Sequence, residues 1–136
     1  HLEVLMVEDD VLIASVVVPA LECHGHKVTL CPSADAAVPL LESAQYFDVL
    51  FTDVVMPGTM TGLDLVEWCR THRPDLPAVM ATGYSAQTSD AVSRKLNKPY
   101  AISDLLAALQ DAVDPARRNK DAGPIPPPIE GGFGPA

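Results

Sequence analysis

The amino-acid sequence predicts a single α/β domain whose parallel sheet is covered by helices on both faces. Short, nearly continuous apolar runs alternate five times with longer segments of helical pattern. Such alternation is typical of parallel strands that are buried on both sides. The chain has 136 residues, which is enough for one domain with its own core and too few for two ordinary domains.

Five short runs have the character of strands in such a sheet. The first four are rich in β-branched or other large aliphatic residues, and each leads into a polar residue or a turn. The fifth run, with the sequence RKLN, is shorter and poorer in apolar residues. The expected strands are residues 3–7, 27–31, 48–52, 76–81 and 94–97.

Helices are expected after the first two strands. Residues 11–24 form a helical segment that is followed by Gly25, a usual residue just beyond a helix end. Asp10 is expected to cap its start, because aspartate favours that position. Ser33 is expected to cap a second helix that reaches about Ala44.

Two further helices are expected in the second half of the chain. The pattern from Thr61 to Asp64 is an acidic variant of the capping box, which opens a helix. Ser103 is expected to cap the last helix, which has an apolar face. The segment between Thr82 and Lys98 is short for a full helix and a strand, so the helix there is expected to be shortened.

The composition changes near Asp114, where we expect the folded domain, residues 1–114, to end. Residues 115–136 hold six of the 13 prolines and four of the 8 glycines. This composition favours a disordered tail or linker. The alternative is a polyproline II ligand at residues 124–128.

The charge balance and the apolar runs exclude several classes of protein. Asp and Glu number 18 against 9 Lys and Arg, a formal charge of −9, whereas direct nucleic-acid binding needs clustered basic side chains. No apolar run is long enough to span a bilayer, and the pattern of a signal peptide is missing. We therefore expect a cytoplasmic protein that does not insert into membranes. Its cysteines, which lack CxxC spacing, are expected to be buried thiols: Cys23, Cys31 and Cys69.

Polar side chains follow four of the five expected strands. Ligands bind an open parallel sheet beyond the carboxyl ends of its strands, so these side chains are expected to meet at one edge. A cluster of carboxylates is unstable unless it is protonated or binds a cation. Because the side-chain atoms available to bind a metal would all be oxygens, Mg²⁺ is the expected ion. The side chains are those of Glu8, Asp9, Asp53, Thr82 and Lys98.

Four segments together resemble the receiver domain of two-component response regulators and hybrid histidine kinases. They read LMVEDD at residues 5–10, FTDVVMPG at 51–58, VMATGY at 79–84 and NKPY at 97–100, and Gly62 also matches. The resemblance extends from residue 3 to about residue 113. It implies a flavodoxin-like (CheY-like) fold with strand order 2-1-3-4-5.

The resemblance also implies roles for the acidic residues. Asp53 matches the phosphoacceptor, which is held in line with an incoming phosphohistidine. Glu8 and Asp9 match the acidic pair that binds Mg²⁺ together with Asp53. The family also uses a main-chain carbonyl as a metal ligand, here that of Val55.

Further matches surround the expected phosphoryl group. Thr82 matches a hydroxyl that hydrogen-bonds the phosphoryl group, and Lys98 matches a lysine that pairs with one of its oxygens. The other matches shape the backbone: Pro57, Gly58, Gly83 and the Lys98–Pro99 bond, which is cis in the family.

The sequence departs from the family pattern at one position. An aromatic switch residue is common three positions before the conserved lysine, but this chain has Lys95 there. Tyr84, in a Thr-Gly-Tyr motif, is therefore the candidate switch residue. The departure leaves the oligomeric state open.

The expected function is that of a phosphoacceptor domain in a two-component phosphorelay. Its partner would be a histidine kinase or a histidine phosphotransfer domain, and it would promote only its own phosphorylation and dephosphorylation. The alternative is a pseudo-receiver, a scaffold that binds a partner without being phosphorylated. A phosphohydrolase with an aspartate nucleophile generally needs a second acid two residues later, where this chain has Val55. The kinase, the output and the full reading frame stay open.

Overall fold

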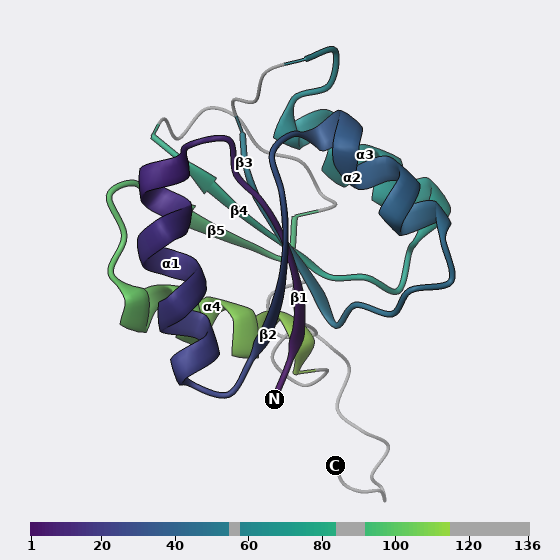
Figure 1. Ribbon diagram of the computed structural model, residues 1–136. Helices are drawn as coiled ribbons and strands as arrows, with labels where there is room; N and C mark the ends of the chain where they lie inside the picture. Colours follow the sequence, from purple (N-terminus) through teal and green to yellow (C-terminus); the bar gives the residue numbers. More distant parts are fainter. Residues whose placement is uncertain (55–57, 84–91, 115–136) are drawn as a thin grey trace, which may run out of the picture.

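The computed structural model describes residues 1–54, 58–83 and 92–114, and its elements surround one five-stranded sheet (Figure 1). All strand pairs are parallel, and the strand order is β2-β1-β3-β4-β5. This confirms the expected fold. The strands are β1 (Glu3–Val7), β2 (Lys27–Cys31), β3 (Val49–Asp53), β4 (Ala78–Thr82) and β5 (Arg94–Asn97). The helices are α1 (Val11–Cys23), α2 (Ala34–Glu42), α3 (Gly62–His72) and α4 (Ile102–Val113).

Two apolar cores lie on opposite faces of the sheet. Successive side chains of a strand point to opposite faces, so Leu5 and Leu50 pack with residues of α2 and α3. Their chain neighbours Val4, Met6 and Phe51 pack instead with residues of α1 and α4. Figure 1 shows the two helix pairs on either side of the sheet. Both faces of the sheet are thus covered by apolar packing, so polar side chains can gather only where the strands end.

The elements expected in the described residues are present, and several of their boundaries differ from the structure by one or two residues. The strand expected at 48–52 lies one residue later, so it includes Asp53. The strand expected at 76–81 begins at Ala78, after Pro77, which has no N–H group for the ladder. The second helix ends at Glu42 rather than near Ala44, because Ser43 is extended and its hydroxyl donates to the Leu40 carbonyl at 2.6 Å.

The helix starts confirm three of the four expected caps. Asp10 and Ser33 accept backbone N–H groups at the starts of α1 and α2, and α3 has the capping box of Thr61 and Asp64. The cap expected at Ser103 is wrong.

The last helix starts two residues earlier than a cap at Ser103 would place it. Ala101 is the extended residue before α4, and its carbonyl accepts from Asp104 and Leu105. Ser103 therefore lies inside the first turn, and no side chain caps this helix.

Two of the three cysteines are buried as expected. Cys31 and Cys69 lie in the core between the sheet and the α2–α3 pair, and burial raises the pKa of Cys69 to about 11. The expectation is wrong for Cys23, which is exposed because it ends α1 on the outward side of the helix. Among the described residues, no helix combines the length and the apolar character that crossing a membrane requires. The expected shortened helix before β5 and the tail at 115–136 fall outside the described residues.

Candidate functional site

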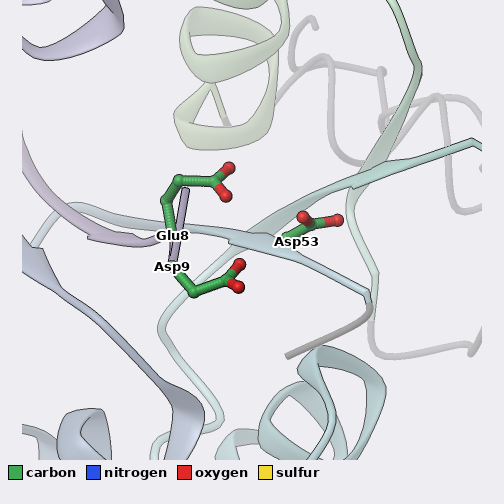
Figure 2. A group of neighbouring side chains, drawn as sticks. All are labelled: Glu8, Asp9 and Asp53. Carbon is green, nitrogen blue, oxygen red and sulfur yellow. The ribbon is translucent and has the colours of Figure 1, made fainter. Parts of the chain in front are cut away.

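Three carboxylates come together at the carboxyl edge of the sheet. Glu8 and Asp9 follow β1, and Asp53 is the last residue of the neighbouring strand β3. One oxygen from each of the three lies within 4.8 Å of one from each of the others. Figure 2 shows the Glu8 and Asp9 side chains extending from the end of β1 toward the side on which Asp53 lies. The structure thus brings together the acidic residues singled out in the sequence.

Glu8 is buried, with 6% of its surface exposed. Its side chain accepts the Asp10 N–H at 3.1 Å, and its own N–H donates to the Cys31 carbonyl of β2 at 2.9 Å. Burial raises the pKa of Glu8, and the negative charge of Asp53 adds to the rise, while the Asp10 N–H acts in the opposite direction. Without a cation, the site therefore disfavours the charged form of this carboxyl group.

Asp53 is also buried, and each of its carboxylate oxygens has a donor. The Lys98 ammonium lies 2.6 Å from Oδ2, and the Val54 N–H donates to Oδ1 at 2.8 Å. The backbone is equally constrained, because a Cβ added at Gly62 would overlap the Asp53 carbonyl oxygen. The first turn of α3 thus packs directly on the end of β3.

Thr82 and Lys98 lie at the ends of the next two strands. Thr82 is the last residue of β4 and is buried, and Lys98 directly follows β5. The Lys98 N–H donates to the Thr82 carbonyl at 2.8 Å, which ties the two strand ends together. The Lys98–Pro99 peptide bond is cis, as the resemblance implied.

Some of the expected site residues cannot be placed. Val55, Pro57 and Tyr84 fall outside the described residues. Gly58 is described and has a positive φ of +99°, which fits a turn there.

Two side chains near this edge were not singled out in the sequence. The Tyr100 hydroxyl is buried and has no hydrogen-bond partner among the described residues. Burial raises the pKa of Tyr100 to about 12, and the charges of Glu8 and Asp53 contribute. Asp35 binds the loop that follows Asp53, as described below. The Asp35 bond joins residues that are 24 positions apart in the chain, so no local pattern could reveal it.

The carboxylate cluster fits a hard divalent cation. All three side chains offer oxygen, the ligand that Mg²⁺ prefers. Two of them are buried, and at this separation like charges repel unless a cation or a proton offsets them. The Lys98 ammonium offsets one negative charge of the three.

The sequence matches the response regulator receiver domain family over residues 4–110. The chain is a receiver domain of that family. Receiver domains belong to two-component signalling and are not normally enzymes in their own right. The match includes all four strand ends that carry the polar side chains.

Curated relatives resemble this receiver domain over a part of their own length. The response regulator protein FleR of Pseudomonas aeruginosa is 32% identical over 132 residues, which are 90% of this chain and 27% of FleR. The DNA-binding transcriptional regulator NtrC of Azospirillum brasilense is 28% identical over 130 residues, 88% of this chain and 27% of that protein. The chain thus spans about a quarter of the length of these relatives.

Solved structures share the fold. A CheY-like receiver domain protein from Methanospirillum hungatei has a TM-score of 0.74 at 24% identity, with 87% of this chain and 97% of that chain covered. The response regulator TrrA of Thermotoga maritima, solved with Mg²⁺ and BeF, has a TM-score of 0.73 at 21% identity, covering 81% and 97%. A receiver domain of a Pseudomonas aeruginosa sensor histidine kinase, with magnesium in its active-site cleft, has a TM-score of 0.73 at 24% identity, covering 82% and 97%.

Proposed function

We propose that this receiver domain accepts a phosphoryl group on Asp53 from a phosphohistidine of a histidine kinase or phosphotransfer domain, with Mg²⁺ bound at Glu8, Asp9 and Asp53. The observation that carries the proposal is the position of Asp53, 2.6 Å from the Lys98 ammonium and beside two further carboxylates. The main-chain carbonyl of Val55 completes the proposed set of metal ligands.

The chemistry needs few groups from the protein. The N–P bond of a protonated phosphohistidine breaks, its electron pair stays on the imidazole, and an O–P bond forms at Asp53. Mg²⁺, when bound, offsets the charge that the carboxylates and the phosphoryl oxygens bring together. The residues of the chain position the carboxylate and the ammonium group before the donor arrives, which is catalysis by orientation.

The surface beside the site supports a protein as the donor. Val11, Leu12 and Val16 of α1 are 77%, 78% and 63% exposed, although they are large and apolar. Leu12 and Val16 also line an apolar groove of about 570 Å³ that reaches Lys98 and Tyr100. Exposed apolar patches of this kind mark sites of protein interaction.

The proposal includes a conformational response. Thr82 is buried at the end of β4, so its hydroxyl is suited to hydrogen-bond a phosphoryl group on Asp53. Because Lys95 occupies the position of the usual aromatic switch, we assign the switch role to Tyr84, two residues after Thr82. We also place the domain in the cytoplasm, where histidine kinases present their phosphohistidine.

The test is labelling of the full chain by acetyl phosphate. We expect Mg²⁺-dependent incorporation of one phosphoryl group as a hydroxylamine-sensitive acyl phosphate, and its loss in Asp53→Asn. Asp48→Asn makes the same charge change at the other end of the sheet and should be labelled like the wild type.

The alternative function is a scaffold that binds its partner without phosphorylation. Absence of labelling in the wild type at saturating Mg²⁺ would favour this alternative. Equal labelling of the wild type and Asp53→Asn would show that another residue is the acceptor.

A further inference from the structure

Asp35, in the first turn of α2, binds the loop that follows the phosphoacceptor strand. Its Oδ2 accepts the Thr59 N–H at 2.9 Å and, more weakly, the Met60 N–H at 3.4 Å. Its Oδ1 accepts the Thr59 hydroxyl at 2.6 Å. Both oxygens of one carboxylate therefore bind a segment 24 residues further along the chain.

The loop is shaped to receive this carboxylate. Gly58 has a φ of +99°, and a Cβ added there would overlap Oδ2 of Asp35. The carboxylate therefore packs against the Gly58 backbone while it accepts from the next residue, Thr59. The hydroxyl of Thr59 lowers the pKa of Asp35, and the two backbone N–H groups contribute. The group is thus charged at neutral pH, which strengthens its hydrogen bonds.

A backbone hydrogen bond joins the two ends of this loop. The Gly62 N–H donates to the Val54 carbonyl at 2.7 Å, directly after Asp53. Between these two anchored residues, Asp35 is the side chain from another element that holds the described part of the loop, residues 58–60.

The segment that precedes Asp35 contacts the acidic pair. Asp35 lies four residues after Cys31, whose carbonyl accepts the Glu8 N–H at 2.9 Å. The strand β2 contributes no carboxylate to the metal cluster of the described residues. The segment that runs from Cys31, at the end of β2, to Asp35, in α2, nevertheless contacts both Glu8 and the loop that follows Asp53.

We propose that Asp35 is a positioning residue of the metal site: its bonds to Thr59 hold residues 58–60, which lead into α3, at a fixed place relative to the acidic pair. This inference rests on the proposed function, because it concerns the same cation. Asp35 does not itself belong to the carboxylate cluster. Its loss should therefore weaken Mg²⁺ binding without removing any ligand.

The test measures Mg²⁺ affinity by calorimetry on the full chain. We expect Asp35→Ala to raise the dissociation constant about tenfold, as is typical for groups that orient metal ligands. Thr59→Val removes only the hydroxyl bond and should raise it about threefold. If the two residues act as one unit, the double variant should bind Mg²⁺ as Asp35→Ala does. In these variants, the rate of labelling by acetyl phosphate at saturating Mg²⁺ should change much less than the Mg²⁺ affinity does.

Asp48→Ala is a matched control. Asp48 also accepts a backbone N–H, that of Glu3 at 2.6 Å, and a hydroxyl, that of Tyr46 at 2.5 Å, but at the opposite edge of the sheet. Its removal should lower the unfolding midpoint in EDTA and leave the Mg²⁺ affinity unchanged.

Two results would overturn the positioning role. One is an Mg²⁺ affinity of Asp35→Ala and Thr59→Val within twofold of the wild type. The other is an equal loss of affinity in the Asp48→Ala control, which would indicate general destabilisation. Failure of the proposed function would look different, because the wild type would then bind Mg²⁺ without being labelled. Should Asp35→Ala not fold, Thr59→Val keeps the test decisive.

Discussion

At the carboxyl end of the sheet, polar side chains are buried, whereas at the amino end they lie near the surface. The buried polar side chains of the described residues all belong to the carboxyl end: Glu8, Thr52, Asp53 and Thr82. At the amino end, Asp48 accepts from Glu3 and Tyr46, and His26 accepts the Leu2 N–H at 3.0 Å. None of these polar amino-end side chains, those of Glu3, His26, Tyr46 and Asp48, is buried.

The difference separates two uses of polar groups. Hydrogen bonds at the amino end satisfy backbone groups where strands begin, and they stabilise the fold by modest amounts. Three carboxylates gathered within 4.8 Å at the carboxyl end cost stability because like charges repel, and burial adds to this cost at Glu8. A costly cluster of this kind is typical of functional sites. The following predictions test this contrast.

The largest effect is expected from Lys98→Ala. The variant removes the ammonium group 2.6 Å from Asp53, and with it the positive charge available to the incoming phosphoryl group. We expect the labelling rate with acetyl phosphate to fall about 10²-fold. Lys27→Ala removes an exposed lysine from the amino end of β2 and should leave the rate unchanged. Equal rates in the two variants would remove the distinction between the ends.

An intermediate effect is expected from Glu8→Gln, measured as thermal unfolding in EDTA. Glutamine keeps an oxygen for the Asp10 N–H but removes a buried negative charge beside Asp53. We expect the free energy of unfolding to rise by about 0.5–2 kcal/mol, and Mg²⁺ to bind about tenfold more weakly. A less stable variant without metal would contradict the view that the cluster costs stability.

The smallest effect is expected at the amino end, from acidification. Burial lowers the pKa of His26, and its Nδ1 must be unprotonated to accept the Leu2 N–H. The stability that this bond contributes is therefore present above the unfolded-state pKa of about 6.5 and is lost as the pH falls through the lower folded-state value.

The measurement for this prediction is the unfolding midpoint between pH 7 and pH 5. Over this range, the unfolding midpoint of the wild type should fall by no more than about 2 °C beyond the fall in His26→Ala. The comparison with the variant is needed because Glu3 raises the pKa of His1, which acts with the opposite sign. A steeper fall in His26→Ala than in the wild type would contradict the prediction.

Much of the fold follows from local patterns in the sequence. Residues 3–7, 27–31 and 94–97 are strands as expected, because short runs that end in a polar residue or a turn are local signals. The start of α4 was misplaced because Ser103 is a good cap by type, whereas the backbone reaches helical geometry already after Ala101. The exposure of Cys23 depends on which side of α1 faces the sheet, and residue type alone does not determine that.

The candidate site was predictable for a different reason. Each of its acidic residues follows a strand, and parallel strands place their carboxyl ends at one edge. The sequence could therefore predict that Glu8, Asp9 and Asp53 meet, but the distances between them come from the sheet register. The bond from Asp35 to Thr59 had no such signal, since it joins the first turn of α2 to the loop before α3, 24 residues further along the chain.

The packing around one glycine joins the end of β3 to the helix that follows it. At Gly62, α3 touches the Asp53 carbonyl so closely that not even a methyl group would fit between them. A displacement that begins at Asp53 would therefore carry the start of α3 with it as one body.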